Sequence, residues 1–141
     1  MPILTEEMKR KAIGLANTPV TIEMEKGMIR RFVEAVGEAN PKYLGDDMVA
    51  PPGLFHTLML VGPRPELPFE LPVKRILDGG GEWEYFVPAR PGDVLTVTTG
   101  IADVIERESG GSSMVLLVRE TTWTNQRGKL VARACGITII R

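Results

Sequence analysis

The sequence has very few residues of the kinds that form disulfides or bind transition metals. It contains one cysteine, Cys135, and one histidine, His56. A single cysteine cannot form a disulfide within the chain, and the apolar, strand-like surroundings of Cys135 indicate a packed thiol. Zinc and iron sites are usually built from several cysteine or histidine ligands. We therefore predict a protein without a metal or another cofactor.

An excess of one charge and long apolar segments are also lacking. The 17 basic and 18 acidic residues are mixed along the chain and leave a net charge of -1. The sequence has no basic stripe or polybasic end of the kind that binds nucleic acid or membrane surfaces. Its first residues lack the order of a signal peptide, and no apolar run reaches ~18 residues. We expect a cytoplasmic protein that binds neither nucleic acid nor membranes.

Length and composition fit one globular domain over residues 1–141. A chain of this size buries roughly two thirds of its unfolded surface. Its hydrophobic content of 43% and charged content of 25% are ordinary for a soluble domain.

The first part of the chain is expected to form two helices and a strand. Thr5 can cap a first helix that fades between residues 14 and 17. Alternating apolar and polar residues predict a half-buried strand over 20–25, followed by a turn at Lys26-Gly27. An amphipathic helix is then predicted over residues 28–37, with Gly37 as a left-handed cap.

Two contrasting segments follow the polar loop of residues 38–52. Residues 53–61 are almost wholly apolar and favour a short helix that is buried on most sides. Residues 63–72 contain four prolines, which exclude a regular element. We expect an extended surface loop or lid there, mobile or dependent on a partner.

The second half predicts an antiparallel sheet. The three long strands are too long to lie flat in a domain of this size, so they are expected to curl at Gly100 and Gly136. A short strand is expected after a flexible glycine segment over 79–81. Together these features predict an α+β fold, a curved antiparallel sheet wrapped around one central helix. The expected strands cover residues 82–86, 94–106, 114–125 and 130–140.

This architecture resembles the hot-dog fold, and the residues resemble the MaoC-like dehydratases, the (R)-specific enoyl-thioester hydratases. The similarity is strongest to the variant called the MaoC-type dehydratase N-terminal domain. The matching segments span most of the chain in the family's order. They are FVEAVGEANP (residues 32–41), APP (50–52), GGEWEY (80–85), PARPGDVL (88–95) and ETTWTNQRGKLV (120–131).

The family's active signature reads Gly-Asp-x-Asn-Pro-x-His, and its Asp and His hold and activate the water that adds to the double bond. In this chain the window runs from Gly37 to Tyr43, with Glu38 in place of the Asp and Tyr43 in place of the His. A phenol with a reference pKa of about 10 cannot replace imidazole as a base near neutral pH. The resemblance therefore implies a binding scaffold with an incomplete catalytic dyad.

The resemblance also implies which residues contact the substrate. Asn40 belongs to the signature, and Pro51, Pro52 and Gly53 lie where the family binds the acyl thioester. His56 follows on the predicted central helix and has two interpretations: a histidine hydrogen-bonded within the core, or a catalytic or thioester-contacting group.

Three functions are compatible with the sequence. The first is a subunit that binds acyl-CoA or acyl carrier protein thioesters and pairs with a second hot-dog chain carrying the intact Asp/His site. The second is a self-sufficient homodimeric hydratase or dehydratase that uses Glu38, with His56. The third is a non-catalytic acyl-thioester binding protein. Because a single hot-dog sheet leaves an edge strand unpaired, we expect a homodimer or a heterodimer with a second MaoC-like subunit.

Overall fold

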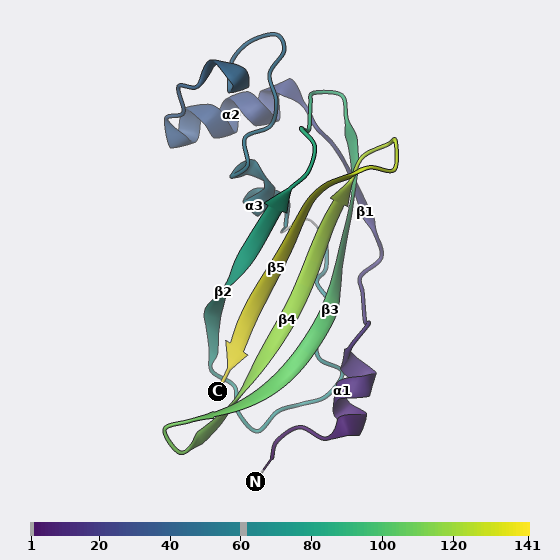
Figure 1. Ribbon diagram of the computed structural model, residues 1–141, viewed down its shortest axis with the longest axis vertical. Helices are drawn as coiled ribbons and strands as arrows, with labels where there is room; N and C mark the ends of the chain where they lie inside the picture. The colour runs from purple at the N-terminus through teal and green to yellow at the C-terminus, as the bar shows by residue number, and fades with distance from the viewer. Residues whose placement is uncertain (1, 60–61) are drawn as a thin grey trace.

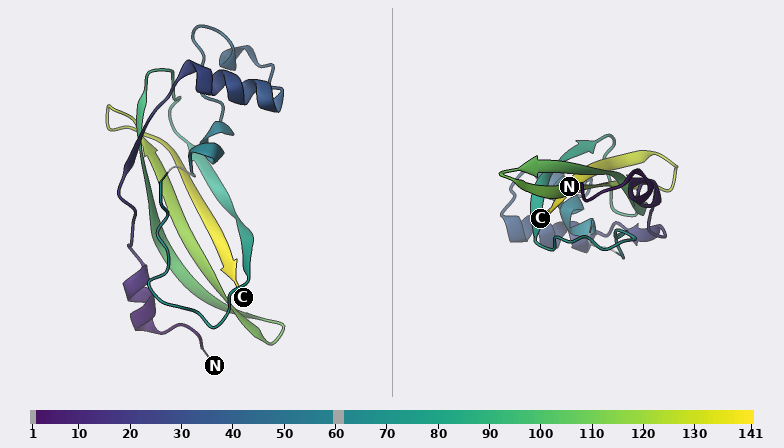
Figure 2. Two further views of the ribbon diagram at one scale, coloured as in Figure 1. Left: turned by 180° about the vertical axis from the view of Figure 1, so that it is seen from behind. Right: turned by 90° about the horizontal axis from the view of Figure 1, so that it is seen from below.

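One curved antiparallel sheet dominates the structure, a computed structural model that describes residues 2–59 and 62–141 (Figure 1). Its five strands lie in the spatial order β1-β3-β4-β5-β2, and every neighbouring pair is antiparallel. Seen end-on, the helices and the connection from α3 to β2 lie on one side of the sheet (Figure 2). The expected curved sheet is therefore confirmed. Its strands are β1 (Val20–Glu23), β2 (Ile76–Tyr85), β3 (Val94–Ser109), β4 (Ser112–Thr124) and β5 (Leu130–Ile140).

The helices are short and begin and end close to the predicted residues. Helix α1 (Glu6–Ala12) starts where the Thr5 hydroxyl accepts a hydrogen bond from the Met8 N–H, 3.1 Å away. Helix α2 (Lys26–Val36) ends at Gly37, whose φ of 71° is left-handed. The turn predicted at Lys26-Gly27 is wrong, because these two residues form the first turn of α2. The first N–H groups of a helix need no partner within the helix, so a helix can begin before its first apolar residue. None of the described helices is long and apolar enough to cross a membrane.

Strand β2 is longer than the sequence suggested. It begins at Ile76 and continues through the three glycines, so the predicted flexible segment over 79–81 is wrong. The glycines lie in a bulge of the ladder with β5. A Cβ on Gly81 would lie 2.7 Å from the Cys135 carbonyl oxygen. Close approach of the two backbones therefore explains glycine at that position.

The β3–β4 hairpin also extends beyond the predicted strands. Its turn consists of Gly110 and Gly111, with φ of 60° and 80°. A two-residue turn with both φ positive matches the twist of paired strands, so the ladder continues to the turn itself.

Helix α3 (Leu54–Leu58) covers one end of the concave face of the sheet. The helix predicted over 53–61 is confirmed across this range, and residues 60 and 61 lie outside the described part of the chain. Phe55 is buried and packs edge-on against Trp123, with ring centroids 5.5 Å apart. His56 and Thr57 are exposed, so α3 is buried on one side and not on most sides.

The other end of the concave face is covered by the connection over residues 62–75, here called the strap, which runs lengthwise over the sheet (Figure 2). As expected from its prolines, it has no helix or strand. Leu67, Phe69 and Leu71 of the strap pack against a second core cluster, separate from the cluster beneath α3. That second cluster consists of Leu4, Ala12, Ile101, Val104, Val115 and Leu117.

A buried arginine ties the strap to the middle of the sheet. Arg119 of β4 is 7% exposed and donates from Nε to the Pro65 carbonyl oxygen (3.0 Å). Its other nitrogens bond the Thr138 hydroxyl (3.3 Å) and the Glu66 carboxylate (3.2 Å). Burial, followed by the nearby Arg64 charge, lowers the pKa of Arg119. These bonds satisfy a guanidinium that would otherwise be costly to bury.

Replacing Arg119 by Met is expected to lower the free energy of unfolding by about 1–3 kcal/mol, because Pro65 and Thr138 lose a buried hydrogen-bond donor. Hydrogen exchange of the strap amides should quicken at the same time. The matched control is Arg133→Met, which removes a half-exposed guanidinium paired with Glu84 and Glu120 and should change stability little. Equal effects of the two substitutions in denaturant unfolding would contradict this role of Arg119.

Candidate functional site

The polar loop after α2 uses two candidate side chains to shape its own backbone. The Glu38 Oε1 atom accepts hydrogen bonds from the N–H groups of Ala39 and Asn40, both 2.9 Å away. The Asn40 Oδ1 atom accepts from the Lys42 N–H (3.2 Å) and caps the 3-10 turn η1 (Pro41–Tyr43). Both side chains are exposed at the surface of the loop.

Tyr43, the residue in place of the family's histidine, is a core side chain. It is 7% exposed and belongs to the cluster beneath α3. Its ring borders a cavity of about 220 Å³, here called the loop cavity. The loop cavity is also lined by Pro52, Phe55, Tyr85 and Phe86.

The segment before α3 is packed closely against its neighbours. Pro51 is buried, and the Pro52 carbonyl oxygen accepts a hydrogen bond from the Tyr85 hydroxyl (3.1 Å). Burial raises the pKa of Tyr85, so the phenol stays protonated and able to donate at neutral pH. A Cβ on Gly53 would lie 2.9 Å from the Phe32 ring of α2, so a larger residue there would require that ring to shift.

His56 is exposed and stacks on an aromatic ring, contrary to its interpretation as a hydrogen-bonded core histidine. The imidazole and the Trp83 ring have centroids 4.0 Å apart and an interplanar angle of 27°. Trp83 in turn stacks on Trp123, with centroids 5.5 Å apart. The imidazole is therefore positioned by ring packing on the concave side of β2.

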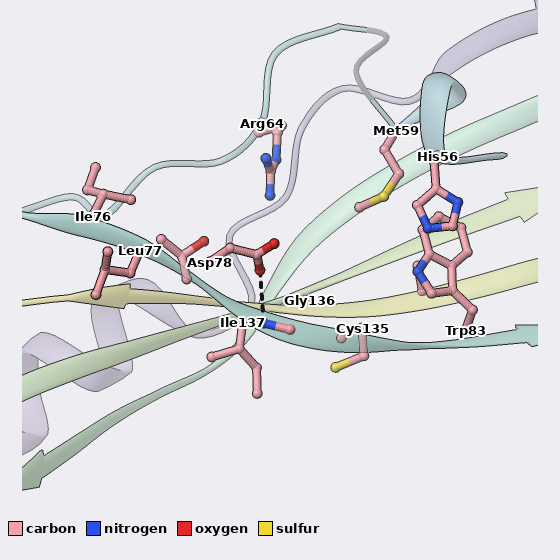
Figure 3. Close-up of a pocket in the computed structure, with 14 residues that line it drawn as sticks. His56, Met59, Arg64, Ile76, Leu77, Asp78, Trp83, Cys135, Gly136 and Ile137 are labelled. Atoms are coloured by element: carbon pink, nitrogen blue, oxygen red, sulfur yellow. Dashed lines mark hydrogen bonds between the residues drawn. The ribbon is translucent and has the colours of Figure 1, made fainter. Parts of the chain in front are cut away.

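A larger cavity of about 610 Å³, here called the β2–β5 cavity, lies beside this stack (Figure 3). Figure 3 shows His56, Met59, Arg64 and Trp83 on one side of the sheet, while Cys135 and Ile137 point to the other side. The cavity is thus formed on the concave side, between α3, the start of the strap and the sheet. Its lining includes Ile76, Asp78, Gly80, Gly81, Ala134, Gly136 and Thr138.

The lining combines apolar and charged groups. Met59, Ile76 and Trp83 are apolar, whereas Arg64 and Asp78 bring opposite charges to the same cavity. The Asp78 Oδ1 atom accepts from the Gly80 N–H at 2.8 Å, which fixes the carboxylate at the β2 bulge. Such a cavity can hold an apolar group and has hydrogen-bonding groups at its margin.

The convex face of β2 and β5 carries a separate charged network. Glu84 bonds Arg133, and this hydrogen bond raises the pKa of the guanidinium. Burial, followed by the Glu120 and Glu82 charges, raises the pKa of the Cys135 thiol. The thiol is therefore neutral near pH 7. In the described ranges, no group of three His, Cys, Asp or Glu side chains is arranged to hold a metal ion.

The structure brings some of the predicted site residues together and separates others. Tyr43 and Pro52 share the loop cavity, and His56 lines the β2–β5 cavity. Glu38 is not among the described residues that line either one. Arg64 and Asp78 were not identified as site residues from the sequence. Arg64 lies in a proline-rich segment, and Asp78 precedes glycines that were expected to be flexible.

Comparisons with known proteins agree with this architecture. The sequence model of the FAS1-like dehydratase domain region matches residues 11–134. A UPF0336 protein of Streptomyces coelicolor is 34% identical over 150 residues, covering 90% of this chain and 96% of that protein.

Solved structures show the same fold at low sequence identity. The MaoC-like dehydratase from Rhodospirillum rubrum has a TM-score of 0.68 and 22% identity, with 92% of each chain covered. The HadBC (3R-hydroxyacyl-ACP dehydratase) complex from Mycobacterium tuberculosis has a TM-score of 0.69 and 20% identity, covering 91% of this chain and 96% of that one.

The family match spans most of the chain, and the structural match to the MaoC-like dehydratase covers 92% of both chains. The chain therefore belongs to the FAS1-like dehydratase domain family and has the hot-dog fold of the MaoC-like dehydratases.

Proposed function

We propose that this chain is the acyl-thioester-binding subunit of a hot-dog hydratase or dehydratase, and that a second hot-dog chain supplies the catalytic Asp and His. The observation that carries this proposal is the state of the signature loop. Glu38 caps a turn through two backbone N–H groups, and Tyr43 is packed into the core. Neither side chain is arranged to activate water beside a substrate.

The hydration reaction explains why Glu38 and Tyr43, in place of the signature Asp and His, matter together. Hydration of a trans-2-enoyl thioester adds the water oxygen to C3 and a proton to C2, and dehydration reverses both steps. A base must take a proton from water, and it must lie within hydrogen-bond reach of that water. A displacement of about 1 Å in a catalytic group can already be very costly to the rate. A partner with an intact dyad would supply this step.

This chain retains groups suited to binding the thioester. Gly53 precedes α3 and follows two prolines, so its N–H is the first donor at this end of the helix. A backbone N–H placed there can stabilise negative charge that develops on the thioester oxygen. The β2–β5 cavity, at about 610 Å³, is within the range of small-molecule sites and lies beside the same helix.

The edge of the sheet offers a surface for the partner. Strand β2 has no neighbour on its outer side among the described residues, and all but one of its ten residues are exposed. Ile76 is 68% and Phe86 is 49% exposed, at the start of β2 and just after its end. A long exposed edge with apolar side chains at both ends offers unpaired backbone groups and apolar contacts to another strand. We infer a dimer in which β2 pairs with the corresponding strand of a second hot-dog chain.

The HadBC comparison supports this arrangement, since that 3R-hydroxyacyl-ACP dehydratase was solved as a complex. Thioesters of CoA and of acyl carrier protein are both compatible with the proposal. In either case the complex interconverts a trans-2-enoyl thioester and the (R)-3-hydroxyacyl form.

The pairing is tested by assaying crotonyl-CoA hydration with the purified chain alone and with a MaoC-type chain from the same organism that carries the intact signature. We expect turnover by the pair and at least a hundredfold less by this chain alone, because it lacks a positioned base. Full activity of the chain alone would reject the pairing. Acyl-CoA binding in a thermal-shift assay, without turnover in any pairing, would instead identify a non-catalytic binding protein.

A second candidate is a self-sufficient homodimer, favoured by one observation: the His56 imidazole lines the β2–β5 cavity and is held there by Trp83. An imidazole can act as a general base near neutral pH. In this arrangement His56 would act with Glu38 from the partner copy.

The two candidates differ in their response to substitution of Glu38 and His56. In the pair, Glu38→Gln and His56→Gln are expected to leave the maximal rate within about fivefold, since neither residue supplies the base. In a self-sufficient homodimer each change should lower the rate by about a hundredfold or more. Circular dichroism and the melting temperature of each variant serve as controls for folding.

A further inference from the structure

Gly136 lies in the interior of β5, where a bend of the strand can favour glycine but no described atom crowds the position of a side chain. It pairs with Gly81 of β2 and with Arg119 of β4. Its φ is not positive, so the backbone would accept any L-residue. A Cβ built on Gly136 has no other atom of the described chain within 4 Å. Glycine in a strand interior costs conformational entropy and removes a side chain that could pack.

The neighbouring glycines of β2 show the contrast. A Cβ on Gly79 would lie 2.9 Å from the Ile137 side chain, and one on Gly81 would lie 2.7 Å from a backbone oxygen. Both are glycine because adjacent atoms approach closely. Within residues 2–59 and 62–141 nothing crowds a Cβ at Gly136, and Gly136 lines the β2–β5 cavity.

The direction of this open space follows from the register of the sheet. Arg119, directly opposite Gly136, is buried on the concave side, and residues paired in a ladder project to the same face. Cys135 and Ile137, on either side of Gly136, point to the convex side (Figure 3). A side chain at Gly136 would therefore enter the cavity and fill part of its floor.

We propose that Gly136 is a specificity-determining residue, whose missing side chain lets the distal part of a medium-chain or longer acyl group lie against the floor of the β2–β5 cavity. This inference rests on the proposed acyl-thioester function and names its substrate class. Met59, Ile76 and Trp83 supply the apolar walls for such a chain. A short acyl group has fewer carbons to place along these walls, so we expect it to be indifferent to a side chain at position 136.

The test is Gly136→Val, with Cys135→Val as the matched control on the opposite face of the same strand. Binding of decanoyl-CoA and butyryl-CoA, which are saturated and not turned over, is measured by calorimetry on the full chain and on its complex with the MaoC-type partner. We expect Gly136→Val to weaken decanoyl-CoA binding at least tenfold and to leave butyryl-CoA binding within twofold. Cys135→Val should change neither. The melting temperature of Gly136→Val should stay the same or rise, because valine favours strands.

The inference would be overturned by equal effects of Gly136→Val on both thioesters, or by wild-type protein that binds decanoyl-CoA no better than butyryl-CoA. A folded Gly136→Val variant that binds both thioesters like the wild type would overturn it as well. Crotonyl-CoA turnover by the wild-type pair is measured in parallel. If that turnover is normal while the decanoyl-CoA prediction fails, the proposed function stands and only the role of Gly136 is rejected.

Discussion

A mismatch in length between the central helix and the sheet decides how the concave face is covered. Helix α3 has five residues and spans about 8 Å, whereas β3 has 16 residues and would span about 50 Å if straight. A helix this short covers only one end of the concave face. The other end must be covered by something else, and the strap does so with Leu67, Phe69 and Leu71. The β2–β5 cavity lies where α3 stops and the strap begins.

The irregular strap must itself be held against the sheet that it covers. A proline-rich segment forms no ladder, so it needs side chains to hold it in place. Arg119 meets this need from the middle of β4 with three hydrogen-bonded partners. Its charge, together with the Thr99–Thr121 hydroxyl pair (2.9 Å), keeps the centre of the concave face polar between the two apolar clusters. The β2–β5 cavity has apolar Met59 and Trp83 next to α3, and charged Arg64 at the start of the strap.

Much of the fold could be predicted from the sequence because it is encoded locally. The caps at Thr5 and Gly37 and the alternation along β3 to β5 depend on residues close in the chain. The start of β2 could not be predicted, because Gly81 is explained by a backbone oxygen of Cys135, far away in sequence. The stacking of His56 on Trp83 likewise joins two residues that are far apart in the sequence. The sequence predicted a loop with an incomplete dyad. It did not predict the β2–β5 cavity, because that cavity forms only where the strap packs near α3 and the sheet.

We propose β2 as the seam at which a second hot-dog chain completes the site. Hydrogen exchange of the β2 amides, with and without the MaoC-type partner, tests this most directly. It should be measured at a concentration where sedimentation shows the isolated chain to be a monomer. We expect the amides within residues 76–86 that do not already bond β5 to become protected in the pair, while those of β1, the opposite edge of the sheet, do not change. An active pair in which the β2 amides exchange as fast as in the isolated chain would contradict it.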